Sequence, residues 1–253
     1  MTPPIFTPDG TEVEEVILPD GSVASEVIAP DGTVVFDAMP DSGLQHEYDA
    51  RVLSSATTFD DQIGDNDLPE NGSPSLVSDG INGQQAVEYD GDTDFHGAND
   101  ESGLSTAGDY TFAFVINTLS DVSERQTIGG QTNQSGFRTS VSSGEWRAVH
   151  PGRFAENGGT VNTNEVYVGV QTYDSDNDAL TLQIGDSVVI SHTGGAADRD
   201  DEMALGFDPD ENSFEAEIYL GHALYYNEHY DADGRGGIVS ALESSWGITS
   251  ADG

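Results

Sequence analysis

The chain has 253 residues, no cysteine and no lysine, and its 7 arginines face 47 acidic residues, which gives a formal net charge of −40. The missing residue types exclude disulfide frameworks, thiolate metal sites, thiol nucleophiles, P-loop lysines and Schiff bases. Such dense carboxylates repel in dilute buffer, but in multimolar salt the Debye length falls to roughly 3 Å and the repulsion largely disappears. The acids are spread through apolar segments rather than gathered in runs, which argues against a disordered acidic tail. The composition therefore predicts a halophilic protein.

The apolar content permits one large β domain or two small ones, with 35% hydrophobic residues and 30 glycines. Residues 1–7 lack the basic and apolar regions of a signal peptide, and no stretch approaches the roughly 20 apolar residues that span a bilayer. We expect neither export by a signal peptide nor membrane insertion. Nucleic-acid binding is disfavoured because phosphate contacts need basic residues.

A repeat organises the first forty residues. The tripeptide Pro-Asp-Gly begins at positions 8, 19 and 30, a spacing of 11 residues, and each copy precedes a segment rich in β-branched residues. Proline presets φ for a turn, aspartate bonds the backbone ahead and glycine accepts positive φ, so each unit predicts a turn followed by a strand. Three such short strands bury little surface alone. We therefore expect residues 1–42 to be an assembly or anchoring segment, the alternative being a small meander packed on the main domain.

From residue 43 onward, short β-rich runs alternate with clusters of Gly, Asn, Asp and Ser. This spacing is typical of a sandwich. Strands are predicted at 85–89, 110–117, 126–128, 137–141, 145–149, 166–173, 179–184, 187–192, 203–207 and 216–226. One helix is predicted over residues 238–246, because Ile238, Leu242 and Trp246 fall at helical spacing after a glycine-rich entry.

Several of these segments carry a family resemblance. The sequence LQHEYD at 44–49, an acidic loop at 60–67 and INGQQAVEYDGDTDF at 81–95 resemble the opening of concanavalin A-like, laminin-G-like jelly rolls. The following YTFAFVI and the hairpin at 173–182 look like later strands of that fold. The final FEAEIYLGHALYY, with a helix ending in WGI, is similar to versions on tailed-virus structural proteins. The resemblance covers residues 43–249 and implies an all-β antiparallel jelly-roll sandwich over 43–253, with function only by analogy.

Four of the seven arginines gather where acids are scarce. Arg125, Arg138, Arg147 and Arg153 lie within 29 residues in which Glu145 is the only acid. Trp146 and His150 belong to the same segment, and an aromatic ring beside arginines can stack on a sugar or meet a partner carboxylate. A face between subunits, an inner core sheet and a ligand site all stay open as interpretations.

Calcium is the one cofactor that the sequence suggests, and none is required. Asp174, Asp176 and Asp178 alternate like the oxygen ligands of a calcium loop. Ala179 and Gly185 stand where an EF-hand needs glycine and a bidentate glutamate, so the segment is no EF-hand. Similar alternations elsewhere show how readily an acidic chain produces this pattern.

Glycoside hydrolysis is the enzyme alternative, because glucanases occur among the resembling folds. Glu215 and Glu217 share one face of a predicted strand, about 6.6 Å apart at a rise of about 3.3 Å per residue. The further acid of the E-x-D-x-E strand in those glucanases is missing, since Ile218 and Tyr219 follow. We therefore do not expect an enzyme.

The sequence thus favours a virion structural protein of a tailed virus of halophilic archaea. Residues 1–42 would join other virion proteins, and a trimer or pentamer would display the lectin-like domain at the virion surface as a capsid decoration, turret or tail fibre. Cell-surface glycan or glycoprotein is the expected outside partner. A cellular carbohydrate-binding or adhesion module and a glycoside hydrolase are the alternatives.

Overall fold

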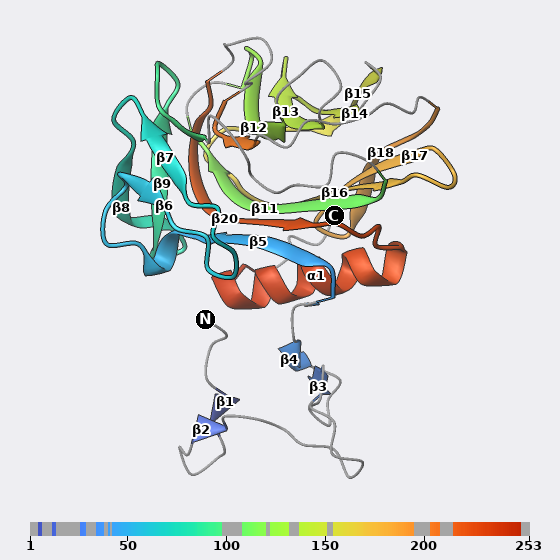
Figure 1. The fold of residues 1–253 in the computed structure, drawn as a ribbon, viewed down its shortest axis with the longest axis horizontal. Helices are drawn as coiled ribbons and strands as arrows, with labels where there is room; N and C mark the ends of the chain where they lie inside the picture. Colours follow the sequence, from blue (N-terminus) through green and yellow to red (C-terminus); the bar gives the residue numbers. More distant parts are fainter. Residues whose placement is uncertain are drawn as a thin grey trace.

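The computed structural model describes most of the chain after residue 42 and four short strands before it (Figure 1). The described residues are 5–6, 12–13, 26–28, 34–37, 40, 42–97, 108–119, 122–131, 137–150, 154–194, 203–207 and 215–248. For the strands before residue 40 and for residues 150, 154 and 155, only the backbone is described.

Two antiparallel sheets of eight strands each lie face to face, and the helix α1 covers the outer face of one of them (Figure 1). The sheet next to α1 is called sheet A. Its spatial order is β18 (Ser187–Thr193), β17 (Ala179–Ile184), β16 (Val166–Asp174), β11 (Tyr110–Thr118), β20 (Glu217–Tyr226), β9 (Gln84–Asp90) and β8 (Ser75–Ile81), with β5 (Leu44–Asp49) also paired to β20. A single 3-10 turn, η1 (Ala50–Val52), follows β5.

The opposite sheet, sheet B, contains the arginine-rich segment. Its spatial order is β15 (Phe154–Thr160), β14 (Glu145–His150), β13 (Arg138–Ser142), β12 (Gln126–Gln131), β19 (Met203–Leu205), β10 (Phe95–Gly97), β7 (Leu68–Asn71) and β6 (Thr58–Phe59). Every strand that the sequence predicts between residues 85 and 226 is present. The predicted antiparallel β-sandwich is confirmed.

The central strand β11 is buried on both faces. Phe112, Phe114 and Ile116 point into the core between the sheets. Ala113 and Val115 point the other way and pack beneath α1. The period-2 pattern of this strand therefore separates two apolar surfaces rather than an apolar and a polar one, because α1 shields the outer face from water.

The core also holds an uncharged histidine. His96 on β10 is completely buried, with Nδ1 2.9 Å from the Tyr89 hydroxyl and Nε2 2.8 Å from the carbonyl oxygen of Ala56. The carbonyl accepts only, so Nε2 donates and Nδ1 accepts from the tyrosine. Burial lowers the pKa of His96 to about 4, because the charged form has lost its water.

The helix α1 (Ala232–Trp246) begins earlier than the prediction of residue 238. Asp231 caps its N-terminus by accepting from the amide of Gly234 at 3.0 Å, and Gly247 ends it in the left-handed conformation. Arg235 is buried in the first turn and donates to the carbonyl of Tyr230 and to Gln183 on β17. These contacts hold a glycine-rich turn in a helix that propensity alone disfavours.

The strand β15 was not predicted, because it contains two consecutive glycines. Gly158 is needed for packing, since a Cβ at this position would collide with the backbone oxygen of Val189 on β18. The edges of sheets A and B therefore approach closely here and close one side of the sandwich. A residue with a side chain would hold these edges apart.

Two pairs of short strands flank the first and the third copies of the N-terminal Pro-Asp-Gly repeat. β1 (Ile5–Phe6) pairs with β2 (Glu12–Val13) across the first Pro-Asp-Gly, and β3 (Glu26–Ile28) pairs with β4 (Val34–Asp37) across the third. The three Pro-Asp-Gly segments themselves lie outside the described residues. β4 lies next to α1 (Figure 1). The domain boundary at residue 42 and the role of this segment in assembly stay predictions.

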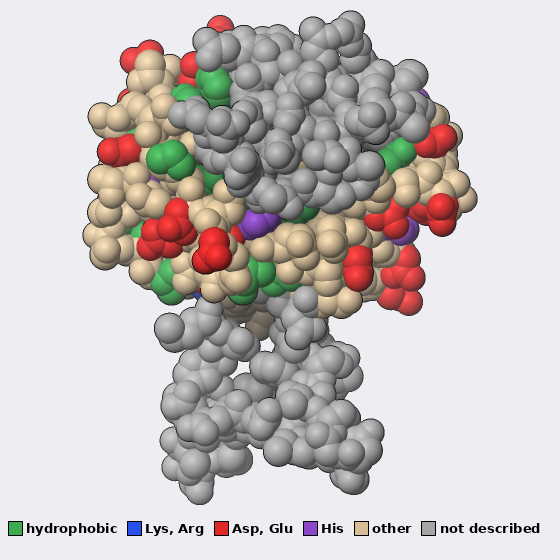
Figure 2. All heavy atoms as spheres, viewed as in Figure 1, with side chains coloured by type: hydrophobic (Ala, Val, Ile, Leu, Met, Phe, Trp, Pro, Cys, Tyr) green, Lys and Arg blue, Asp and Glu red, His purple; other side chains and the backbone are tan. Residues whose placement is uncertain are grey.

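Carboxylates are scattered over the described surface, and apolar side chains show only in small groups on the face seen in Figure 2. Among the described residues, three large apolar side chains are well exposed, Val52, Ile63 and Val188. Within the same ranges, no helix has the length and apolar content to cross a bilayer.

Candidate functional site

Sheet B brings two of the predicted arginines together. Ser140 on β13 pairs with Arg147 on β14, so Arg138 and Arg147 lie diagonally on one face of the sheet. Arg138 is only 5% exposed, which removes it from the open surface of the isolated chain. Arg125 precedes β12 and lines a pocket described below. The side chain of His150 and the whole of Arg153 lie outside the described residues, and a contact role for this segment stays a prediction.

Trp146 requires a correction. Its side chain is 1% exposed and packs inside the sandwich, with ring centroids 5.9 Å from Phe114 and 5.1 Å from Tyr167. A ring in this position has no free face for a sugar. Trp146 therefore belongs to the core, and its neighbour Arg147 points to the opposite side of β14.

The predicted calcium residues form a hairpin turn between β16 and β17. Asp174 accepts from the amides of Asp176 and Asn177 at 3.0 and 3.1 Å and from the Asn177 side chain at 2.6 Å. The bond from the Asn177 side chain lowers the pKa of Asp174. Asp178 accepts from the Tyr173 hydroxyl at 2.9 Å. In the part of the chain that the structure describes, the three carboxylates do not converge on one point, so calcium binding here stays a prediction without geometric support.

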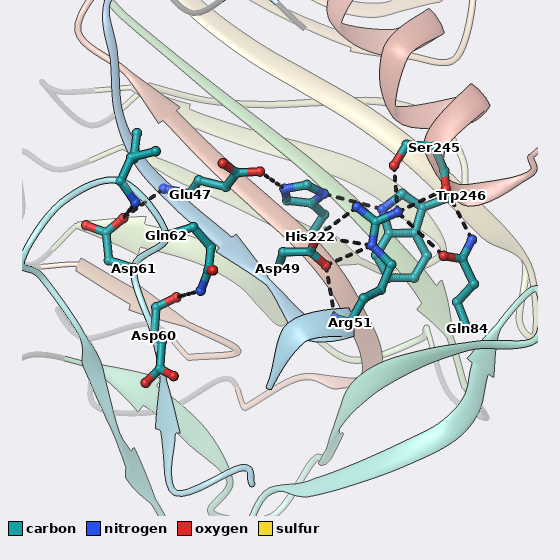
Figure 3. A network of polar contacts seen from close by, with 11 residues as sticks. Glu47, Asp49, Arg51, Asp60, Asp61, Gln62, Gln84, His222, Ser245 and Trp246 are labelled. Atoms are coloured by element: carbon teal, nitrogen blue, oxygen red, sulfur yellow. Dashed lines mark hydrogen bonds and ion pairs between the residues drawn. The ribbon is translucent and has the colours of Figure 1, made fainter. Parts of the chain in front are cut away.

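A polar network that sequence reasoning missed lies under the end of α1 (Figure 3). Arg51 donates from Nε and Nη2 to the two oxygens of Asp49, at 2.9 and 2.7 Å. Its Nη1 reaches the hydroxyl and the carbonyl of Ser245 at 2.6 and 3.0 Å, and its guanidinium carbon lies 4.6 Å from the centre of the Trp246 ring. The side chains of Arg51 and Asp49 are 14% and 2% exposed. One arginine thus neutralises a buried acid and fastens the last turn of the helix.

The charge of Asp49 depends on these partners. Burial alone raises the pKa of Asp49, but the hydrogen bonds and the positive charge of Arg51 outweigh burial, so the pKa lies below its ordinary value. Asp49 therefore stays ionised while the pair is intact.

Glu47, Asp49 and His222 also place one potential metal-ligand atom each within 4.8 Å of one another. His222 is fully buried, with Nε2 3.1 Å from Glu47 and Nδ1 3.4 Å from the indole nitrogen of Trp246. Because the indole can only donate, Nδ1 accepts and the proton of neutral His222 sits on Nε2, facing Glu47. No lone pair is left on Nε2 for a metal, and Arg51 already occupies Asp49. The group fits a hydrogen-bond network rather than a metal centre.

The acidic loop at 60–67 is organised around one carboxylate. Asp61 lies 2.6 Å from Nδ1 of His46 and accepts from the backbone amides of Glu47 and Ile63. Burial raises the pKa of Asp61, but the hydrogen bonds from His46 and the backbone outweigh burial and lower it. The loop is thereby fixed to β5, and Asp61 acts as a structural acceptor.

A pocket of about 200 Å³ opens where β9, β12 and β20 begin or end. Asp90, Gly91, Glu124, Arg125, Gln126, Glu215 and Glu217 line it. Register places Glu217 beside Asp90, and the Glu217 amide donates to the Gln126 side chain at 3.1 Å, which joins sheet A to sheet B. A Cβ on Gly91 would lie 3.2 Å from that of Glu217, so glycine keeps this side of the pocket open. We call this feature the rim pocket.

The rim pocket joins two groups of residues that the sequence analysis treated separately. Arg125 was predicted as a contact residue of the arginine-rich segment, and Glu215 and Glu217 were considered as the carboxylates of a glycoside hydrolase. Asp90, Glu124 and Gln126 were not predicted as site residues. The pairing of β9 with β20 places Asp90 beside Glu217, and the packing of sheet B on sheet A brings residues 124–126 to the same place. No local sequence signal reports either arrangement.

No family model matches the chain, and no curated protein matches its sequence. Solved structures match in fold. A Trypanosoma rangeli sialidase in complex with sialic acid has a TM-score of 0.65 at 12% identity, covering 90% of this chain and 37% of that one. The binding domain of Paraclostridial Mosquitocidal Protein 1 has a TM-score of 0.63 at 12% identity, covering 79% of this chain and 52% of that one.

A third similar structure is botulinum neurotoxin type C, whose cell entry depends on interaction with two ganglioside molecules. It gives a TM-score of 0.61 at 12% identity, covering 79% of this chain and 51% of that one. The chain thus spans about a third to a half of the length of these proteins. At this identity the likeness establishes a shared β-sandwich fold and nothing about the site.

Proposed function

We propose that the sandwich is a glycan-binding, lectin-like module and that the rim pocket is its binding site. The observation that carries the proposal is the convergence of four carboxylates, one guanidinium and one amide around a concave space. Carboxylate and amide oxygens accept from sugar hydroxyls, and the guanidinium and amide nitrogens donate to them. The sialidase and neurotoxin neighbours support the choice of ligand class only as an analogy of fold.

We place this module on the virion of a tailed virus of halophilic archaea, as a homo-oligomer anchored by residues 1–42. The support is the lysine-free composition with a charge of −40, together with the paired strands of the N-terminal repeat. Short two-stranded sheets gain stability by packing against other chains. A cellular adhesion module is the alternative setting for the same binding site.

A glycan array probed with full-length protein in multimolar KCl tests the binding proposal. We expect retained glycans whose binding falls at least about tenfold in Glu217→Gln, which removes one charged acceptor from the pocket. Glu70→Gln is the matched control, because Glu70 is exposed on β7 and does not line the pocket. An array without any retained glycan would remove the proposed function.

Light scattering in high salt tests the setting, with antibody labelling of particles by electron microscopy as the second measurement. We expect a stable oligomer and labelled virions. A full-length monomer, or particles without label, would contradict the virion proposal and leave the adhesion alternative.

Glycoside hydrolysis is a second candidate, because Glu215 and Glu217 line the same pocket. Their expected separation of about 6.6 Å falls at the lower edge of the roughly 6.5–9.5 Å range of inverting enzymes. If array glycans are cleaved, Glu217→Gln should abolish cleavage with the fold intact. Cleavage that persists in this variant would exclude the pair as catalytic residues.

A further inference from the structure

We propose that the rim pocket selects sugar rings without an acidic group and excludes uronates and sialic acids. This inference rests on the glycan binding proposed above and names the ligand class of the same pocket. It follows from the balance of charge inside the pocket rather than from the fold, whose relatives include a sialidase that holds sialic acid.

The lining residues carry an uneven charge. Asp90, Glu124, Glu215 and Glu217 contribute four negative charges and Arg125 one positive charge, so the pocket carries 1 − 4 = −3 when all are ionised. No histidine or further arginine lies among the described residues that line it. A ligand carboxylate entering this space is surrounded by an excess of like charge, and salt screens charges in a pocket less than charges on the open surface.

The contrast with the network beneath α1 shows what charge balance does elsewhere in the chain. There, Asp49 takes both donors of the Arg51 fork, and Glu47 faces the Nε2 proton of His222. That network can hold carboxylates because each one has a dedicated donor. In the rim pocket the carboxylates outnumber the cation. A ligand group that donates hydrogen bonds is therefore favoured there, and a ligand group that only accepts them is not.

Size and position narrow the class further. A volume of about 200 Å³ is below the roughly 300 Å³ at which pockets for drug-sized ligands begin, which fits one sugar ring rather than an enclosed oligosaccharide. Asp90 and Glu124 are exposed at the opening, and Gln126 is buried at the junction of the sheets. A terminal ring can therefore present hydroxyl or amino donors inward while the rest of the glycan stays outside.

Matched sugar pairs test this selectivity. Full-length protein in multimolar KCl is titrated with the methyl glycosides of glucose, galactose and mannose and with the corresponding uronates, which differ only at one carbon, and with glucosamine and sialyllactose. We expect binding of at least one neutral or amino sugar and at least about tenfold weaker binding of its uronate. The ratio should grow as the salt concentration is lowered.

Variants separate the pocket from the rest of the surface. Glu124→Gln combined with Glu217→Gln changes the pocket charge from −3 to −1, and we expect the ratio of neutral to acidic binding to fall toward one. Glu70→Gln, outside the pocket, should leave the ratio unchanged. Circular dichroism confirms that each variant retains the folded sandwich.

Each outcome decides a different point. Acidic sugars that bind as tightly as their neutral partners, and lose binding in Glu217→Gln, would overturn the inference and leave the proposed function standing. Sugar binding that is insensitive to both pocket variants would overturn the assignment to this pocket. Absence of binding to every sugar, together with an empty array, would remove the proposed function and this inference with it.

Discussion

The network beneath α1 and the rim pocket use the same residue types for opposite purposes. Beneath α1, Arg51 and His222 give each carboxylate a partner, and the cluster is nearly closed to water. At the rim, four carboxylates surround one arginine and the pocket is open. In the first region the balance of charge fixes structure, and in the second the excess of negative charge suits the hydrogen-bond donors of the proposed ligand.

The largest effect should come from breaking the buried pair. Arg51→Ala leaves Asp49 buried without its donor and frees the end of α1, so we expect a loss of about 3–5 kcal/mol in the free energy of unfolding. Chemical denaturation in high salt measures it. Adding Asp49→Asn to this variant should restore part of the loss, because the unpaired charge is gone. A loss below about 1 kcal/mol would contradict the structural role of the network.

A buried polar group without charge sharpens the comparison. The unfolded chain protonates His96 near its ordinary pKa of 6.5, whereas the folded chain does so only near pH 4. The neutral state of His96 therefore contributes to the free energy of unfolding fully above pH 6.5. About 3 kcal/mol of that free energy is lost as the pH falls from 6.5 to 4. Unfolding measured across this range should show a steeper loss than in His96→Gln. Equal slopes in the two proteins would exclude His96 as the cause.

A change in close packing at a glycine should have a smaller effect on the free energy of unfolding. Gly158→Ala forces a Cβ into the Val189 backbone, and we expect a loss of about 1–3 kcal/mol. Gly236→Ala in α1 is the matched control, because its Cβ meets open space and alanine favours a helix, with an expected gain of about 0.5–1 kcal/mol. Thermal unfolding distinguishes the two signs. Tolerance of Gly158→Ala would mean that the sandwich edge is not closed here.

The smallest effect on stability should come from the pocket. Glu217→Gln should change the free energy of unfolding by no more than about 0.5 kcal/mol, since it removes charge from an already overcharged opening. Denaturation alongside Arg51→Ala provides the direct contrast. If Glu217→Gln destabilises the chain as strongly as Arg51→Ala, the pocket is a structural cluster and the distinction drawn above fails.

The fold could be predicted from the sequence where pattern and burial agree. The strand at 110–117 and the sandwich itself follow from period-2 runs and turn residues, and both are present. The predicted start of α1 was wrong, because capping by Asp231 and the contacts of Arg235 stabilise a first turn that contains several glycines. β15 was missed because its glycines serve a contact with β18 that lies 31 positions from Gly158 at Val189.

The candidate site could be predicted only in fragments. Alternation along β14 already places Trp146 and Ala148 on the face opposite Arg147, so the burial of Trp146 was available from the pattern. The rim pocket was not, because Asp90 meets Glu217 through strand register and Arg125 joins them through the packing of one sheet on the other, neither of which shows in sequence spacing. The same holds for Arg51 and Ser245, whose contact spans nearly the whole domain.

The fastening of α1 by guanidinium groups has a consequence for alkaline brine. Arg235 holds the first turn and Arg51 the last. The guanidinium has the highest ordinary pKa of the basic side chains, although burial lowers the pKa of Arg235. With no lysine to neutralise, alkali removes little positive charge from the molecule, and burial keeps Tyr48 and Tyr89 protonated by raising their pKa values. Acidification protonates Asp49 and His96, and we therefore expect low pH rather than high pH to unfold the domain.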